Sequence, residues 1–223
     1  SFHVMVESNL TITANFEFTQ WADNYTVFIS ENGLDFEEFK QDYSNKIYIN
    51  PLRTDSVYYL KVTGSNSAGS SYPTEVLGGI PSINKHDILI VNGFDRTGNT
   101  SNTFDYIRFY GKPLIERGYS FSSASNEAVY KELVDLNEYE LVIWMLLDES
   151  TTDDTFNPLE QELVAEYLES GGKMLVTGSE VGWDLVEMGN SADEEFYRKY
   201  LKASYISDTP NENQSGTYYT ADP

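Results

Sequence analysis

The chain has 223 residues, a net charge of −22 and no cysteine. This length suffices for two ordinary domains, and a hydrophobic content of 40% supports packed cores. The charge excludes nucleic acids and anionic membrane surfaces as partners, because both need a basic footprint. The lack of cysteine excludes disulfides, thiolate metal sites and a Cys nucleophile. No apolar stretch reaches the length of a membrane span. Cations, neutral glycans and basic proteins remain as partners.

The first 81 residues alternate between apolar and polar positions and are rich in β-branched and aromatic residues. The expected strands are 10–14, 25–30, 46–50 and 57–63. The segment Glu31–Gly33 is a hairpin signal between Ile29 and Phe36. No helical period intervenes, so residues 1–81 are predicted to form a small antiparallel sandwich. Trp21 is expected in its core.

A short hinge over 82–86 is predicted to separate this half from an α/β domain over 87–223, in which strands alternate with helices. Pro113 is expected to break the first helix or to start a second. The predicted strands are 87–92, 119–123, 140–146 and 173–177, and the predicted helices are 104–117, 125–134 and 158–170. The fold class is therefore a parallel sheet covered by helices on both sides, with no continuous sheet across the hinge.

The last predicted strand runs into Gly178-x-Glu180-x-Gly182 and then into a helix-like segment. Such glycines let a strand turn sharply into a helix and expose the residue between them. In hydrolases and amidotransferases that residue is a Ser or Cys nucleophile, and here it is Glu180. We expect Glu180 at a tight turn with strained backbone and positive φ.

In an open parallel sheet, ligands collect beyond the carboxyl ends of the strands. The chain places polar residues there, including Arg96 and Glu149. The candidate binding residues are Asn92, Asp95, Asn126, Glu127, Asp148, Glu180, Trp183 and Asp184. They suit a cation or sugar hydroxyls, and a carboxylate pair among them suits acid–base work on a glycan. The alternative interpretation is that these residues are solvated in loops, and that Glu127 and Asp184 are charges in the first turns of helices, where the helix dipole favours them. Trp183 is a candidate for stacking on a sugar.

The loop Asp148–Asp154 carries four acidic residues but lacks the spacing of an EF-hand. No cofactor is therefore expected, and Ca²⁺ stays open as an alternative.

Two segments carry a family resemblance: Ala22–Ser30, with Tyr25-Thr-Val27, and Tyr58–Gly69, with Asn66-Ser-Ala-Gly69. They resemble the strands and the turn of a fibronectin type III domain, and the likeness covers about residues 1–80. The Trp usual in the second strand of that family is missing, and Phe16 is the nearest large residue. The resemblance implies a spacer or adhesion module without chemistry of its own.

The second half, from Ile88–Asp95 through Leu141–Leu146 to Leu175–Asp184, resembles class I glutamine amidotransferase-like domains. More narrowly, it resembles exported bacterial proteins labelled "xanthan lyase", in which a fibronectin type III module precedes such a domain. The resemblance implies a three-layer, flavodoxin/amidotransferase-like parallel sheet. It also implies further strands where this chain has the polar stretch 207–217, so the domain is expected to be incomplete. The family's nucleophile falls on Glu180, and no His follows it.

These features together predict an exported bacterial cell-surface or extracellular protein with a non-catalytic α/β domain that interacts with glycan or cell envelope. One alternative is a carbohydrate-active hydrolase or lyase that uses carboxylates around Glu180. Another is a structural subunit of an extracellular assembly, bound to protein partners. Glutaminase and serine-type acyl transfer are not expected, because the turn offers neither a thiol nor a base for Ser179.

Overall fold

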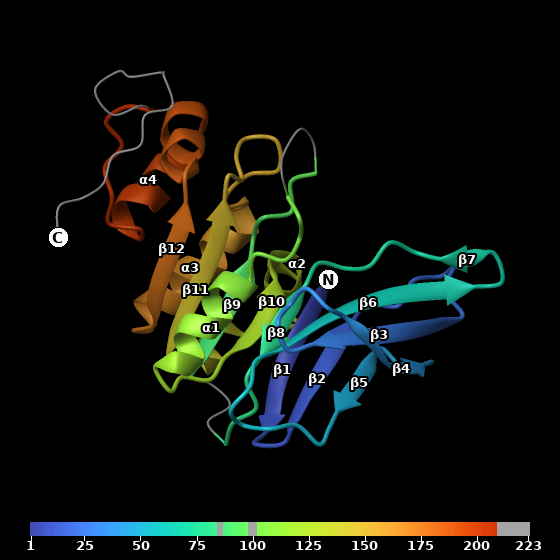
Figure 1. The fold of residues 1–223 in the computed structure, drawn as a ribbon. Coiled ribbons are helices and arrows are strands. Elements are labelled where there is room, and N and C mark those ends of the chain that lie inside the picture. The colour runs from blue at the N-terminus through green and yellow to red at the C-terminus, as the bar shows by residue number, and fades with distance from the viewer. Residues whose placement is uncertain (84–86, 98–101, 209–223) are drawn as a thin grey trace.

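The computed structural model describes residues 1–83, 87–97 and 102–208. Its strands form one seven-stranded sheet, ordered β12-β11-β9-β10-β1-β2-β5, and one smaller sheet, ordered β4-β3-β6-β7 with β8 also paired to β6. Figure 1 shows the first half of the chain as a sandwich on one side and the helices gathered on the other.

The first half contains eight strands that form the sandwich. They are β1 (Phe2–Ser8), β2 (Thr11–Phe16), β3 (Asn24–Ser30), β4 (Glu37–Asp42), β5 (Lys46–Ile49), β6 (Tyr58–Asn66), β7 (Gly69–Ser70) and β8 (Leu77–Gly79). Strands β1, β2 and β5 pair antiparallel and share one core with β3 and β6. The hairpin between β3 and β4 is confirmed. Trp21, expected in the core, is 47% exposed, because it lies in the loop before β3 rather than on an inward-facing strand position.

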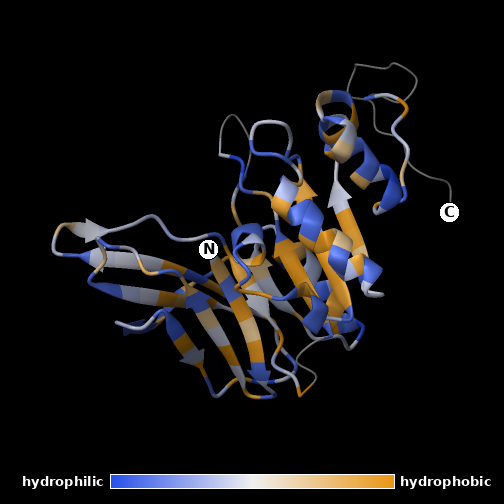
Figure 2. Ribbon diagram, turned by 180° about the vertical axis from the view of Figure 1, so that it is seen from behind, coloured by the Kyte–Doolittle hydropathy of each residue, from blue (hydrophilic) through white to orange (hydrophobic). Residues whose placement is uncertain are grey.

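The second half alternates strands with helices. Its elements are β9 (Ile88–Asn92), α1 (Arg108–Glu116), β10 (Ser122–Ser125), α2 (Asn126–Tyr130), the 3₁₀ turn Leu136–Glu138, β11 (Leu141–Leu147), α3 (Pro158–Glu169), β12 (Lys173–Gly178), a π-helical turn (Trp183–Met188) and α4 (Ser191–Lys199). All pairings among β10, β9, β11 and β12 are parallel. The two central strands of this part, β9 and β11, are almost continuously hydrophobic (Figure 2), as expected for strands buried on both faces.

Helices cover both faces of the parallel strands, as predicted. One face packs with residues of α1 and with the sandwich, in a core that includes Ile90 and Ile143. The opposite face packs with residues of α2, α3 and α4 around Trp144. Pro113 neither breaks nor restarts α1. The helix continues through it because Leu114 and Ile115, directly after the proline, pack against the core.

The large sheet is continuous across the junction, which contradicts the expectation of separate sheets. Strand β1 pairs antiparallel with β10, and His3 and Val4 face Ala124 and Ser123. The physical reason is that the outer edge of β1 and the outer edge of β10 would each expose unpaired backbone groups, and their pairing satisfies both. One hydrophobic core also contains side chains from both halves. The division into 1–81 and 87–223 stays a prediction, and residues 84–86 of the predicted hinge lie outside the described residues.

Among the described residues, no helix combines the length and the apolar character needed to cross a membrane.

Candidate functional site

The candidate site lies where the parallel strands end. Helix α1 carries the chain from β9 to β10, and α2 then carries it back past β9 to β11. The loops after β9 and after β11 therefore leave neighbouring strands at one edge of the sheet. That edge is where open α/β sheets bind ligands.

Six carboxyl groups interact with one another at this edge. They come from the segment before β8, the loop after β9, the start of α2, the loop after β11 and the first turn of α3. This acidic cluster consists of Glu75, Asp95, Glu127, Glu149, Asp153 and Glu160. The amides of Asn92 and Asn126 lie among them.

Glu75 joins the sandwich half to this edge. Its carboxylate accepts a hydrogen bond from Nδ2 of Asn92, the last residue of β9. Burial raises the pKa of Glu75 to about 8, against the lowering effect of Asn92, and the charges of Glu127 and Asp95 raise it further. Glu75 is therefore largely protonated at neutral pH.

Asp95 and Glu160 both interact with the side chain of Asn126. Burial raises the pKa of Asp95 to about 6 and that of Glu160 to about 7, and the Asn126 amide acts in the opposite direction on both. Glu160 is 1% exposed. Its Oε2 accepts from Asn157 N at 2.8 Å as part of the capping box of α3, and its Oε1 has no hydrogen-bond partner within the described parts of the chain.

Glu149 connects the loop after β11 to the loop after β9 by hydrogen bonds. It is fully buried, and its Oε2 accepts from the backbone N–H groups of Asp95 (3.2 Å) and Arg96 (2.9 Å). Its Oε1 accepts from Ser150 N at 3.0 Å. Burial raises the pKa of Glu149, and these backbone donors oppose the shift. The carboxylate is thus held in one position by both loops.

Sequence reasoning found part of this cluster. The structure brings together Asn92, Asp95, Asn126 and Glu127, as expected for residues that follow parallel strands. Glu75 and Glu160 were missed, since neither follows a strand of the parallel sheet. A signal for Glu160 exists in Asn157-Pro158-x-Glu160, a capping box whose Glu is directed back toward the helix start.

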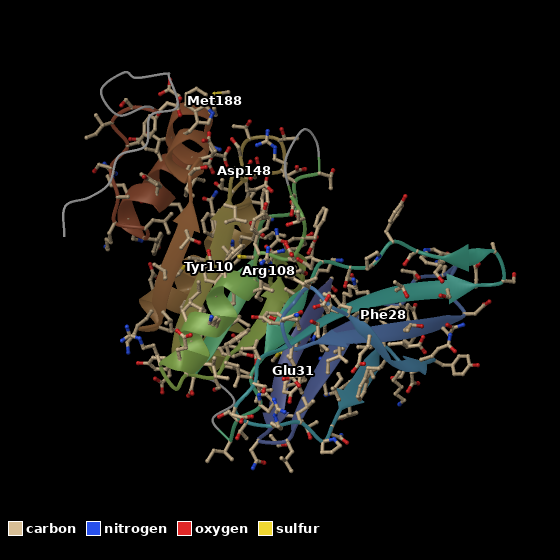
Figure 3. The ribbon with its side chains drawn as sticks, viewed as in Figure 1. Phe28, Glu31, Arg108, Tyr110, Asp148 and Met188 are labelled. Atoms are coloured by element: carbon tan, nitrogen blue, oxygen red, sulfur yellow. The ribbon has the colours of Figure 1, made fainter. Side chains whose placement is uncertain are left out.

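The other candidates lie elsewhere. Asp148 is exposed on the loop after β11, and Figure 3 shows it at the upper edge of the sheet. Glu180 is half-buried and its pKa is raised, first by burial and then by Asp208. The remaining charges that act on Glu180 are those of Arg96, Asp148 and Asp184. Trp183 is half-buried at the start of the π-helical turn.

The turn at Glu180 is as tight as predicted: two residues, Ser179 and Glu180, separate β12 from the helical segment at Val181. The expected positive φ at Glu180 is wrong. The strained residue is instead Leu147, at φ 49°, the last residue of β11. Its carbonyl accepts from Ser179 N at 2.7 Å, so the turn is held by the neighbouring strand rather than by distortion at Glu180.

The flanking glycines are needed for packing. A Cβ on Gly178 would lie 2.9 Å from Leu146 Cβ, and one on Gly182 would lie 2.9 Å from the hydroxyl of Tyr197. Both positions therefore allow a close approach that no larger residue permits without a shift.

Asp184 has a structural partner. It is buried, and its Oδ2 accepts from both the backbone N–H and the hydroxyl of Thr155 at 2.7 Å. These bonds fasten the loop after β11 to the π-helical turn, so Asp184 is neither a solvated charge nor part of the acidic cluster.

We expect Thr155→Val to lower the free energy of unfolding by about 2 kcal/mol, because the buried Asp184 carboxylate loses a hydroxyl donor while the volume is kept. Urea unfolding monitored by circular dichroism measures the change. Thr151→Val, at an exposed position of the same loop, serves as the control. Equal stabilities of the two variants would show that the Thr155 hydroxyl contributes nothing.

A second concave surface lies on the sandwich. This aromatic groove, about 380 Å³ in volume, is lined by Ser1, Phe16, Glu17, Phe18, Thr19, Trp21, Tyr25, Val62, Gly64, Ser71, Tyr72 and Thr74. Three of its rings are exposed: Phe18 by 62%, Trp21 by 47% and Tyr72 by 95%.

The groove has a fixed floor. The Trp21 ring packs on Gly64, where an added Cβ would lie 3.1 Å from it, and Asn66 holds the Trp21 carbonyl at 2.8 Å. The Phe18 ring lies 5.9 Å from that of Tyr25, centroid to centroid. At the rim, Glu17 accepts from Lys131 Nζ at 2.6 Å, next to the end of α2. The aromatic groove therefore adjoins the helix that carries Asn126 and Glu127.

Comparison with known proteins gives similarity over part of the chain. No family model matches the sequence. Tyrosine-protein phosphatase 69D of Drosophila melanogaster is 22% identical in an alignment of 153 residues, which covers 58% of this chain and 10% of that protein. The chain thus spans about a tenth of that relative's length.

The similar solved structures are fibronectin type III domains. The sixth such domain of human fibronectin type III domain containing protein 3 is 14% identical, with a TM-score of 0.34, and the match covers 45% of this chain and 88% of that one. A Fn3-like protein from Clostridium thermocellum is also 14% identical, with a TM-score of 0.33, over 35% of this chain and 84% of that one. The strand order, β1-β2-β5 against β4-β3-β6-β7, makes the first half a fibronectin type III-like sandwich.

Proposed function

We propose that this chain is part of a secreted or cell-surface protein in which a fibronectin type III-like module presents a glycan-binding surface. The observation that carries this proposal is the aromatic groove. Exposed rings held on a rigid floor offer apolar faces to the C–H groups of a sugar, and a net charge of −22 disfavours anionic ligands. The ligand class is therefore a neutral glycan of the kind found in cell envelopes.

The α/β half is proposed to be a non-catalytic, amidotransferase-like domain. The strand order β10-β9-β11-β12 supports this, because the flavodoxin-like doubly wound order is second, first, third, fourth. Glu180 stands where such domains carry a nucleophile, and the charged groups that act on it are Asp208, Arg96, Asp148 and Asp184, with no histidine among them. Bacterial origin and a likeness to proteins labelled "xanthan lyase" remain part of the proposal.

A glycan array, followed by affinity measurement on the best neutral glycan, tests the proposal. We expect Trp21→Ala and Tyr72→Ala each to weaken binding at least about fivefold, roughly 1 kcal/mol. Tyr43→Ala removes a ring that is 79% exposed and outside the groove, and should leave binding unchanged. Binding to no neutral glycan, or equal losses in all three variants, would refute the assignment. Concentration-dependent self-association lost in Trp21→Ala would favour a structural subunit instead.

A second candidate, a carbohydrate-active hydrolase, is favoured by a different observation. Glu160 has a pKa of about 7 and Asp95 one of about 6, values that suit a general acid near neutral pH. The carboxylates in question belong to the acidic cluster and not to the surroundings of Glu180. Turnover of a bound glycan that is abolished by Asp95→Asn would support this candidate over the binding module.

A further inference from the structure

Three carboxylates at the carboxyl edge of the sheet are close enough to share one ion. One oxygen each from Asp95, Glu149 and Asp153 lies within 4.8 Å of the others. Oxygens bound to one Ca²⁺ at 2.3–2.6 Å lie at most about 5 Å apart. The two loops that supply them follow β9 and β11, so the ion would sit between neighbouring parallel strands.

The innermost of the three is already positioned. Glu149 is fully buried, and the backbone N–H groups of Asp95, Arg96 and Ser150 fix both its oxygens. Asp95 is half-buried and Asp153 is exposed. Solvent exposure therefore increases from Glu149 through Asp95 to Asp153. An ion at this position would have one rigid ligand on its inner side and access from solvent on its outer side.

A second observation concerns Glu160, whose carboxyl group is buried beside Asp95. Glu160 is 1% exposed, and its Oε1 has no hydrogen-bond partner within the described parts of the chain. Among the charged groups, Asp95 has the largest effect on Glu160, and the Asn126 amide interacts with both side chains. A buried oxygen without a hydrogen-bond donor, on a side chain that interacts with Asp95, is expected where a cation and its bound water complete the site.

We propose that Asp95, Glu149 and Asp153 bind a divalent cation, and that this cation is Ca²⁺. The donor set consists of carboxylate oxygens, which Ca²⁺ and Mg²⁺ prefer over the nitrogen and sulfur ligands of Zn²⁺. The donors come from irregular loops with different exposure, and Ca²⁺ tolerates such geometry, whereas Mg²⁺ demands a near-ideal octahedron.

The site would remain open on the side of Asp153. Three carboxylates leave coordination positions for water or for hydroxyl groups of a ligand, since Ca²⁺ takes six to eight oxygens. A sugar that extends from the aromatic groove past α2 is a suitable second ligand. This last step rests on the proposed glycan binding, whereas the ion site itself does not.

Isothermal titration of the full chain, freed of metals and titrated with CaCl₂, tests the inference. We expect one saturable site and a rise in the melting temperature with Ca²⁺, and a much smaller response to MgCl₂. Asp153→Asn is exposed and should fold, and it should weaken Ca²⁺ binding at least about tenfold. Asp95→Asn should do the same.

Asp148→Asn and Asp154→Asn remove neighbouring charges of the same loop and serve as matched controls, expected to keep the affinity. Absence of heat and of a thermal shift up to about 10 mM Ca²⁺, above the range of weak extracellular sites, would overturn the inference. Equal losses in the controls would also overturn it, because they would show diffuse attraction by the acidic surface.

Glycan binding measured with Ca²⁺ and with EDTA separates the two proposals. Ca²⁺ binding without any glycan binding leaves the ion site standing and removes the proposed function. If the chain binds glycan equally well in EDTA and binds no Ca²⁺, the proposed function stands and the ion site is wrong.

Discussion

Glu160→Gln is expected to remove a large part of the pH dependence of stability. The carboxyl group has a pKa of about 7 in the folded chain and 4.5 as its ordinary value, so the folded state binds more protons between these values. Its contribution to the free energy of unfolding is therefore fully present below pH 4.5 and is lost as the pH rises through 7. The loss amounts to about 3 kcal/mol. The glutamine variant keeps an oxygen for Asn157 N and has no charge to lose.

Urea unfolding from pH 5 to pH 9 in EDTA measures this effect. The variant should match the wild type near pH 5 and exceed it by about 3 kcal/mol at pH 9. Glu162→Gln, at an exposed position of the same helix, controls for the removal of one negative charge. If the wild type and Glu160→Gln lose stability in parallel between pH 5 and pH 9, the raised pKa of Glu160 is wrong.

The two halves are expected to unfold together. Leu60 on β6 and Leu146 on β11 are both fully buried, one in the core shared with the sandwich and the other beneath α3 and α4. Truncation of either to Ala should cost about 2–5 kcal/mol. Because β1 and β10 pair in one sheet, each truncation should lower the stability measured in the other half by the same amount.

Hydrogen exchange followed by mass spectrometry measures the stability of each half separately. Peptides from β3 and β6 report on the first half, and peptides from β11 and β12 report on the second. Leu34→Ala, exposed on the β3–β4 hairpin, should change neither set. Two separate unfolding transitions, with Leu60→Ala lowering the stability of the sandwich alone, would show that the continuous sheet does not couple the halves.

The continuous sheet bears on the proposed function as well as on stability. A fibronectin type III-like module joined by a flexible hinge would act as a spacer. Here β1 belongs to both halves, and Glu75 of the first half hydrogen-bonds to Asn92 of the second. The aromatic groove and the acidic cluster thus keep a fixed distance, so a ligand long enough to reach both meets a preformed surface.

The sequence by itself determined the local structure. Alternation of apolar residues located β2, β3, β5 and β6, and continuous apolar runs located β9 and β11, because these patterns report burial on one face or on both. Pro158 and Gly171 predicted the start and the end of α3 to within two residues. The glycine pair around Glu180 located the strand-to-helix turn, because steric limits on the backbone act between near neighbours.

Only the tertiary structure decided how these elements meet. The pairing of β1 with β10 joins residues about 120 positions apart, and nothing in the residues of either strand specifies the other. The backbone strain at Leu147, rather than at Glu180, depends on a bond from the next strand. The acidic cluster likewise draws Glu75 and Glu160 from segments outside the parallel strand ends. Their raised pKa values come from burial, which is a property of the assembled fold and not of the neighbouring sequence.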